Sequence, residues 1–354
     1  MRESSRGMSH DLDFRNVRKI FIRSTNWIGD AVMTTPAMGA VRAAFPDAEV
    51  VVAANPAVAE LLTPHPSCDR VMVFDKKKRH RGIGGFLRFC MELRRERFDL
   101  AILFQNAIEA AIMAHVAGIP KRVAYGTDLR GFLLTHSVPC GKMERSLHHT
   151  LYYRRMLGAL GIEIEGGGER LLLSCTKEET ERAGERIGED GTWVAINPGA
   201  AYGSAKRWLP ERFAAVADGI VRELGAFILL TGGPGEIEIG RDIEAAMQAR
   251  PLNLIGKTSV RDMMALLSRC RLMVTNDSGP MHVAAAFGIP IVALFGPTDH
   301  TTTSPLSPSC RIVRKPVSCA PCLKRRCPTD HQCMEGITVD DVLEAVRSLL
   351  VSLP

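Results

Sequence analysis

The chain has 354 residues, of which 46% are hydrophobic and 24% charged, as in ordinary globular proteins. Its length exceeds the size at which one hydrophobic core usually keeps growing, so two domains are expected. Forty-five Lys and Arg against 39 Asp and Glu leave a modest formal charge of +6. No run approaches the roughly 18 apolar residues of a membrane span, and residues 1–8 lack the apolar segment of a secretory signal, so we expect a cytoplasmic protein.

Strand-like runs rich in Val and Ile alternate with segments of helical period from residue 18 onward. The expected strands are residues 19–23, 49–53, 71–74 and 100–104, and the expected helices are 30–44, 86–97 and 107–117. This alternation predicts βαβ units and a parallel sheet.

The pattern pauses between about residues 129 and 192 and then resumes. A glycine run at 166–168 and a charged helix at 177–187 fill the pause. Further strands are expected at 193–196, 226–230, 252–255 and 271–274, with helices at 210–224, 235–249 and 260–270. The sequence therefore predicts an α/β protein with two Rossmann-like arrays, and ligands bind outside the carboxyl ends of such strands, in an interdomain cleft.

The predicted organisation has four parts. They are an N-terminal tail (1–17), a first Rossmann-like domain (18–175), a second one (190–336) and a C-terminal helix (337–354) that is a candidate to pack back across both domains.

A polar turn, Asn276-Asp-Ser-Gly279, separates an apolar strand from a short apolar helix, and a second strand follows from Pro290. It places a carboxylate, a hydroxyl and backbone N–H groups at a helix N-terminus, which suits an anionic or polyhydroxylated ligand. The alternative is that Asp277 or Ser278 only caps the helix, and the turn by itself favours that reading.

The first βα turn, residues 23–30, contains one glycine, Gly29. A dinucleotide fingerprint needs three, so nicotinamide chemistry is not supported. The turn instead presents the Asp30 carboxylate at the mouth of the sheet. The competing interpretation is an acid that serves only the helix dipole.

The second array opens with a loop that resembles a diphosphate site. Its glycines permit close backbone approach, and two cations precede a helix that Pro210 can initiate. The residues concerned are Gly199, Gly203, Ser204, Lys206 and Arg207. The loop lacks the Walker A spacing, and a solvated basic turn remains the alternative.

The next strand ends at Thr231-Gly-Gly-Pro-Gly-Glu236. Glu236 can accept hydrogen bonds from ribose hydroxyls or a purine amino group, or it can serve only the start of a helix.

Taken in chain order, these turns resemble the bacterial heptosyltransferase family. The matching pieces are Ile28-Gly-Asp30 with Thr34-Thr-Pro36, Asn197-Pro-Gly199 with Lys206-Arg-Trp208, Gly232-Gly-Pro-Gly-Glu236, and Asn276-Asp-Ser-Gly-Pro-Met-His282 with Phe295-Gly-Pro-Thr298. The resemblance implies a GT-B fold, ADP-heptose as donor, a lipid-linked Kdo/heptose lipopolysaccharide acceptor, an inverting metal-independent reaction and no cofactor.

By the same resemblance, Asp30 would be the general base on the acceptor hydroxyl, and Lys206 would offset the charge of the leaving diphosphate. The implied donor-binding residues are Gly199, Ser204, Arg207, Glu236, Asp277, Ser278, Gly279 and His282. In one departure, Gly199-Ala-Ala201 stands where some relatives place Thr hydroxyls for the phosphate.

Basic residues gather in the N-terminal half, with the densest run at 76–81. They suit a phosphate-bearing acceptor and peripheral contact with the inner membrane, although a solvated basic loop is the alternative. No aromatic motif accompanies them, so nucleic acid is not expected. The residues expected to bind the acceptor are Lys76, Lys77, Arg79, Arg122 and Arg130.

The ten cysteines are expected to be reduced thiols, since five are scattered in core-like contexts. Cys319, Cys322, Cys327 and Cys333 resemble a zinc site, but their spacing lacks a second Cys-x₂-Cys pair, so buried thiols or a conditional disulfide are preferred. Asp11-Leu-Asp13 is the one Asp-x-Asp match, in the predicted tail, and no metal is expected there.

Two alternatives to a heptosyltransferase stay open at this point. One is another GT-B sugar transferase or a sugar-nucleotide epimerase. The other is a catalytically silent nucleotide-sugar-binding module, against which Asp30, Lys206 and Asp277 together weigh.

Overall fold

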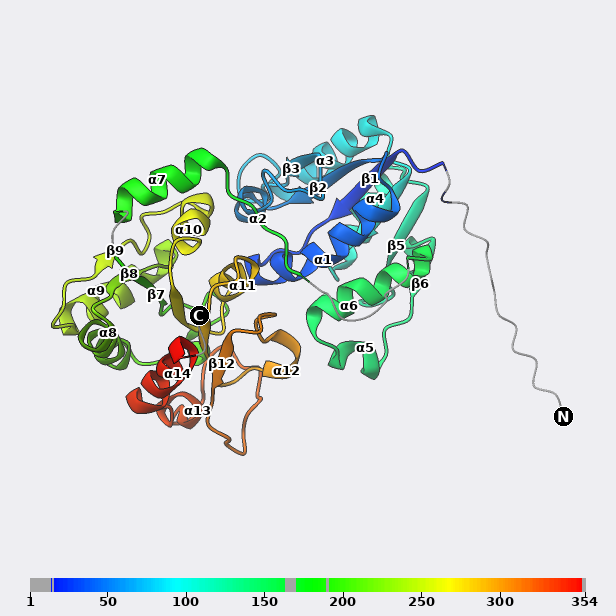
Figure 1. The fold of residues 1–354 in the computed structure, drawn as a ribbon. Helices are drawn as coiled ribbons and strands as arrows, with labels where there is room; N and C mark the ends of the chain where they lie inside the picture. Colours follow the sequence, from blue (N-terminus) through cyan, green and yellow to red (C-terminus); the bar gives the residue numbers. More distant parts are fainter. Residues whose placement is uncertain (1–13, 15, 163–169, 189–190, 352–354) are drawn as a thin grey trace.

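The computed structural model describes residues 14, 16–162, 170–188 and 191–351. Most of the expected tail, including Asp11-Leu-Asp13, and the glycine run at 166–168 therefore lie outside the described residues. Figure 1 shows two lobes, each built around its own sheet.

The first sheet has the strand order β3-β2-β1-β4-β5-β6, and every pairing in it is parallel. Its strands are β1 (Lys19–Arg23), β2 (Glu49–Ala54), β3 (Arg70–Val73), β4 (Leu100–Leu103), β5 (Lys121–Tyr125) and β6 (His136–Val138). Its helices are α1 (Ile28–Ala44), α2 (Pro56–Leu61), α3 (Gly82–Glu96) and α4 (Ile108–Val116). The predicted parallel sheet is confirmed, and β5 and β6 are additions that the apolar pattern missed.

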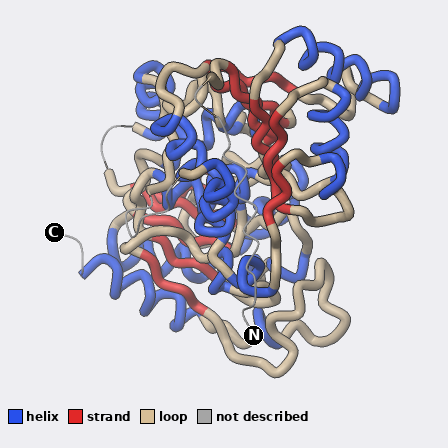
Figure 2. The backbone as a smooth tube through the Cα atoms, turned by 90° about the vertical axis from the view of Figure 1, so that its right-hand side faces the viewer, coloured by secondary structure: helices blue, strands red, loops and turns tan. Residues whose placement is uncertain are grey.

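The second sheet is also parallel, with the order β12-β11-β10-β7-β8-β9. Its strands are β7 (Trp193–Asn197), β8 (Phe227–Leu230), β9 (Leu252–Asn253), β10 (Leu272–Asn276), β11 (Ile291–Leu294) and β12 (Cys310–Val313). Its helices are α8 (Pro210–Leu224), α9 (Ile237–Ala246), α10 (Val260–Leu267) and α11 (Gly279–Ala286). Helices cover both sides of the strands, as Figure 2 shows.

Further helices and turns complete the described chain. They are α5 (Lys142–Ser146), α6 (His149–Met156), α7 (Lys177–Ile187), α12 (His300–Thr303), α13 (Gln332–Glu335) and α14 (Val339–Val351), with 3₁₀ turns η1 (Gly131–Leu133), η2 (Leu157–Leu160), η3 (Ser204–Lys206) and η4 (Pro234–Glu236). No helix in the described ranges is long and apolar enough to cross a bilayer.

The C-terminal helix α14 packs on the second array. It lies against α8, β11 and β12, and its Val342, Leu343 and Val346 are buried in the core of that array. The apolar face of this helix is therefore used within the second array.

The two arrays meet through helices α1 and α11, which contact each other. A Cβ at Gly29 would lie 2.9 Å from His282 Cδ2, and one at Gly279 would lie 3.1 Å from Ile28 Cβ. The two helix N-termini therefore touch. Because α1 follows β1 and α11 follows β10, the carboxyl edges of the two sheets face each other, as the sequence predicts for a ligand site.

Candidate active site

The Asp277 carboxylate is the centre of the site on the second array. It follows β10 and is nearly buried, with 5% of its side chain exposed. Lys206 Nζ and Thr298 Oγ1 each donate to its Oδ2 at 2.6 Å. Within the described chain, no donor contacts its Oδ1. Asp277 is thus bound to neighbouring loops, and one oxygen remains for a ligand.

The capping alternative for the Asn-Asp-Ser-Gly turn fails. Ser278 is the N-cap residue of α11 by position, but its side chain makes no capping hydrogen bond. Its hydroxyl instead donates to Asn197 Oδ1 at 3.0 Å and pairs with Thr275 Oγ1 at 3.1 Å. The N–H groups of the first turn of α11 therefore have no side-chain cap, and such a helix end attracts anions.

Asn276 ties this turn to the loop that opens the second array. Its Nδ2 donates to Pro198 O at 2.7 Å, and its Oδ1 accepts from the Trp208 N–H at 3.2 Å. Both ends of the basic loop are therefore bonded to the side chain at the carboxyl end of β10. This buried amide fixes where the loop lies relative to Asp277.

Lys206 sits at the end of η3 with its charge beside Asp277 and its Nζ 5.2 Å from the centre of the Tyr202 ring. Removing two charges from water costs free energy, so this pair depends on its close contact and on the hydrogen bond that Thr298 donates to the same carboxylate. The geometry thus brings Lys206, the expected catalytic cation, together with Asp277, an expected donor-binding residue.

Gly199 and Glu236 are also brought together. A Cβ at position 199 would overlap the Glu236 carboxyl group, so any other residue there would displace that carboxylate. Glu236 Oε2 also accepts from the Gly233 N–H at 2.7 Å. Glu236 therefore bonds to the start of η4, as the helix-start reading has it, and it also lies against the phosphate-type loop.

Ser204 and Arg207 lie on either side of Lys206 in the sequence and differ in their exposure to solvent and in their contacts. Ser204 is exposed at the start of η3. Arg207 turns back on its own loop, where its Nη2 donates to Ala200 O at 3.4 Å, while its buried Nε has no partner among the described residues. An unpaired buried donor is costly, and an anion on this loop would satisfy it.

Asp30 lies opposite, in the first turn of α1. The N-cap residue of that helix is Trp27, so Asp30 is not the cap. Its side chain is 30% exposed, and its Oδ1 lies 3.5 Å from His149 Nδ1 on α6. A half-open carboxylate with a basic neighbour is accessible to a hydroxyl that must lose a proton.

His282 is buried between the two edges, with 3% of its surface exposed. Burial lowers its pKa to about 4, against the opposing charges of Asp277 and Asp30. Its Nδ1 has no hydrogen-bond partner in the part of the chain that the structure covers. The ring is therefore neutral at pH 7, with an unused polar atom where the two helix ends meet.

The residues expected to bind the acceptor divide into two groups. Lys76, Lys77 and Arg79 are exposed, with Lys76 2.5 Å from Glu109 and Arg79 2.6 Å from Glu92. Arg122 and Arg130 are used internally.

Arg122 donates to Leu133 O at 2.7 Å and Arg130 to Tyr125 O at 2.9 Å, and burial lowers the pKa of both. Their guanidinium groups brace the loop after β5 instead of facing solvent.

Sequence reasoning missed two residues at the site, His149 and Thr298 as a partner of Asp277, and it gave no role to Arg23. Arg23 is buried at the end of β1, where burial lowers its pKa to about 10, and its Nη2 donates to Asn26 Oδ1 at 3.0 Å. His149 lies in the stretch where the strand pattern pauses. Its position beside Asp30 is set by the packing of α6 on α1, and no local sequence pattern predicts that packing.

The cysteine-rich segment braces the Lys206 loop. Tyr202 OH donates to Leu323 O at 2.9 Å, and the Ala205 N–H donates to Arg325 O at 3.1 Å. Cys333 is buried and Cys319 exposed, and burial followed by the nearby thiols raises the pKa of Cys333. Within the described ranges, no three His, Cys, Asp or Glu side chains are arranged to hold a metal ion.

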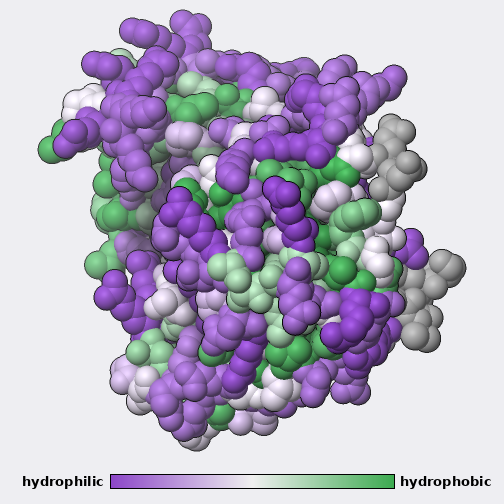
Figure 3. All heavy atoms as spheres, turned by 90° about the vertical axis from the view of Figure 1, so that its left-hand side faces the viewer, coloured by the Kyte–Doolittle hydropathy of each residue, from purple (hydrophilic) through white to green (hydrophobic). Residues whose placement is uncertain are grey.

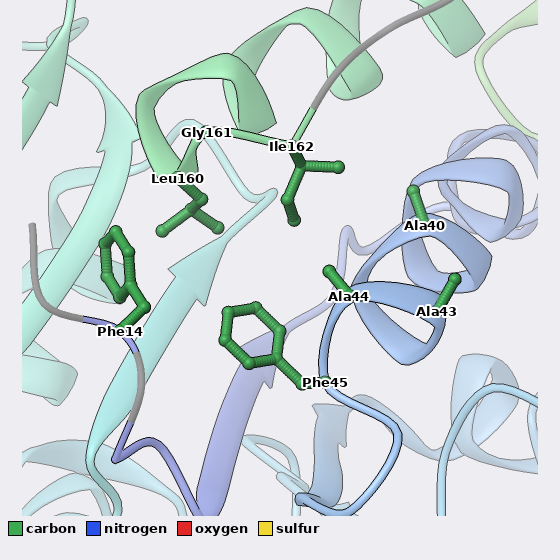
Figure 4. Close-up of a pocket in the computed structure, with 8 residues that line it drawn as sticks. All are labelled: Phe14, Ala40, Ala43, Ala44, Phe45, Leu160, Gly161 and Ile162. Carbon is green, nitrogen blue, oxygen red and sulfur yellow. The ribbon is translucent and has the colours of Figure 1, made fainter.

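A pocket of about 580 Å³ lies at the other end of α1. Its lining residues are Phe14, Ala40, Ala43, Ala44, Phe45, Leu160, Gly161 and Ile162 (Figure 4). Ala43 and Asp30 are 13 positions apart on one helix, which is about 20 Å. The labelled side chains carry no polar group that could bond to the hydroxyls or phosphates of a sugar nucleotide.

Two facing Rossmann-like arrays define a GT-B fold of the glycosyltransferase type, with paired Lys206 and Asp277 at one facing edge and Asp30 at the other. Solved structures agree with this fold. One described as the Escherichia coli ADP-heptose LPS heptosyltransferase II is similar with a TM-score of 0.81 and 27% identity, over 94% of this chain and 99% of that one. A family 9 glycosyltransferase from Veillonella parvula reaches 0.86 and 26%, over 95% and 98%.

The chain belongs to glycosyltransferase family 9 (heptosyltransferase), whose model matches residues 86–332. The lipooligosaccharide heptosyltransferase 2 of Campylobacter jejuni is 28% identical over 341 residues, 94% of this chain and 98% of that protein. Membership in this family favours a transferase over the epimerase and the silent binding module. The resemblance in the sequence motifs is thereby confirmed.

Proposed function

We propose that this chain transfers L-glycero-D-manno-heptose from ADP-heptose to the inner core of lipopolysaccharide, as the second heptosyltransferase of that assembly. The cysteine-rich tail and the Lys-Arg-Trp segment at 206–208 support the choice of the second enzyme, as do the names of the relatives. One observation carries the proposal: the Lys206 and Asp277 pair lies beside the uncapped start of α11, which touches the start of the helix that bears Asp30.

The donor would lie on the second array. Its diphosphate would meet the N–H groups of Ser278 and Gly279 and the loop from Gly199 to Arg207, while Glu236 would accept from the ADP part. Asp277 Oδ1 would accept from heptose hydroxyls. Lys206 now neutralises Asp277, and it would offset the negative charge that develops on the leaving diphosphate.

The reaction would be a single displacement. Asp30 takes the proton of the acceptor hydroxyl as that oxygen forms a bond to the anomeric carbon. The bond from that carbon to the diphosphate breaks, and ADP leaves with the electron pair, which inverts the anomeric centre. A positioned base of this kind contributes about 10²–10⁴-fold to the rate.

The acceptor would approach from the first array. Lys76, Lys77 and Arg79 are exposed near its carboxyl edge and can meet the phosphates of a lipid-linked Kdo/heptose acceptor. Arg122 and Arg130 would act on the acceptor only indirectly, because both hold the loop after β5. A lipid-linked acceptor also implies a cytoplasmic enzyme in peripheral contact with the inner membrane.

The test uses the purified full chain, ADP-heptose and two defined acceptors, one lacking heptose and one carrying a single heptose. We expect ADP release and a product one heptose heavier with the mono-heptosylated acceptor. Turnover only with the heptose-free acceptor would overturn the choice of linkage. No ADP release from either, by protein that is folded by circular dichroism, would overturn the transfer itself.

A further inference from the structure

Helix α3 is anchored firmly to the first array. Phe89, Cys90 and Leu93 are buried along one side, and the Phe89 ring lies 4.7 Å from the ring of Phe74. At its start, a Cβ on Gly85 would overlap the backbone of His80, so the basic loop is pressed against the first turn. The outer face of this helix is therefore held in a fixed place.

That outer face is unusually apolar. Ile83, Leu87 and Met91 are spaced four residues apart, which aligns them along one side of the helix. Their exposed fractions are 82%, 45% and 47%. Single exposed apolar residues are common, but three that are aligned on one face of a helix form an apolar ridge, and the exposure of this ridge to water is unfavourable.

Positive charge surrounds the ridge. Arg88, Arg94 and Arg95 lie on the exposed part of α3, and Lys77, Lys78 and Arg81 precede it. None of these six makes an ion pair with any residue that the structure describes. The acids of the helix are already engaged, Glu92 with Arg79 at 2.6 Å and Glu96 with Lys19 at 2.6 Å. The face is thus apolar in the middle and cationic around it.

The face of the molecule on the side of α7, α8 and α9 differs in polarity from the exposed face of α3. There, hydrophilic residues cover most of the surface and the apolar ones are scattered (Figure 3). Its charges are also balanced within short distances, as where Arg241 meets Glu238 at 2.6 Å.

We propose that α3 is the membrane-docking element of this protein, with Ile83, Leu87 and Met91 entering the interfacial region of an anionic lipid surface and the surrounding cations meeting its headgroups. This inference names the element that makes the proposed membrane contact, and its biological role rests on the proposed function. Amphipathic helices with an apolar stripe and flanking Lys and Arg bind such surfaces through both parts. Docking through α3 brings the lipid anchor of an acceptor to the same array that carries Asp30.

The experiment is co-sedimentation of the full chain with vesicles, without ADP-heptose or acceptor. We expect binding to vesicles of phosphatidylethanolamine with phosphatidylglycerol, little binding to phosphatidylcholine, and loss of binding as salt is raised. Changing Ile83→Glu and Leu87→Glu together should weaken partitioning at least about tenfold, since it removes apolar contact and adds repelled charge. Arg88→Gln with Arg95→Gln should weaken it by about tenfold and reduce its salt dependence.

The matched control is Leu224→Glu, which changes an exposed apolar residue at the end of α8 and should bind vesicles as the unchanged protein does. Circular dichroism and turnover with a short-chain, water-soluble acceptor should be the same for the Ile83/Leu87 variant and the unchanged protein. Equal binding to both kinds of vesicle, no binding at all, or unaltered binding of that variant would overturn the proposal. Because vesicle binding is measured without substrates, it can fail while heptosyl transfer stands, and the reverse also holds.

Discussion

The two facing edges of the molecule are built differently. On the second array, Lys206, Asp277 and Thr298 form a bonded group, and Asn276 ties two loops together behind it. On the first array, the Asp30 side chain is 30% exposed, and its Oδ1 lies 3.5 Å from His149 Nδ1. The edge that would receive the charged, relatively rigid sugar nucleotide is preorganised, whereas the edge that would receive a bulky acceptor leaves its carboxylate accessible.

The sharpest way to test this difference is to change the base on the open edge. Asp30→Asn keeps the shape but cannot accept the proton, so transfer should fall by about 10²–10⁴-fold while ADP-heptose affinity changes little. The rate is measured by ADP release and the affinity by calorimetry. Asp47→Asn, an exposed carboxylate on the same array, is the control and should leave both unchanged. A large loss of donor affinity in Asp30→Asn would move this residue to the donor side.

A change on the bonded edge should affect both binding and rate. Lys206→Met removes the cation, leaves Asp277 as a nearly buried carboxylate without its counter-ion, and should lower turnover by about 10²–10³-fold. It should also weaken ADP affinity, unlike Asp30→Asn. Lys257→Met, which removes an exposed cation of the same array, serves as the control in calorimetry. Unaltered ADP affinity in Lys206→Met would show that the cation does not meet the diphosphate.

A smaller effect is expected at His149, a positioning residue for Asp30. His149→Ala should lower kcat by about tenfold, with little change in the KM for ADP-heptose, because it removes a neighbour that orients the carboxylate. His149→Gln, which retains a hydrogen-bond donor, should recover part of that loss. If the alanine and glutamine variants have the same kcat and the same pH profile as the unchanged enzyme, the contact has no role in positioning Asp30.

A last effect concerns stability and not activity, through His282 at the junction of the edges. Its pKa is about 4 when folded, below the ordinary 6.5, so the unfolded chain binds the proton first. The stabilisation that this implies is complete above pH 6.5 and is lost as the pH falls towards 4, by about 2 kcal/mol at pH 5. In urea unfolding, His282→Gln should lose less stability than the unchanged protein between pH 7.5 and pH 5. His65 and His80, whose pKa values are also lowered by burial, remain in both proteins and cancel. Identical losses would mean that His282 titrates normally.

The fold could be predicted where the apolar pattern was strong. The strands expected at 19–23, 49–53 and 100–104 match β1, β2 and β4 closely, because these central strands are buried on both faces. β5 and β6 were missed because Lys121, Arg122 and His136 interrupt the apolar pattern, and their pairing depends on the neighbouring strand.

The sequence by itself determined the two arrays, the polar turns at their strand ends and the family, since period, glycine placement and short motifs are local properties. Only the tertiary structure decided that Asp277 binds Lys206 and Thr298, that His149 lies beside Asp30, that Arg122 and Arg130 are internal braces, and that α14 packs on α8, β11 and β12. Each of these depends on segments distant in the chain meeting in space. Side-chain type limits what such a contact can be, but packing selects which partner is present.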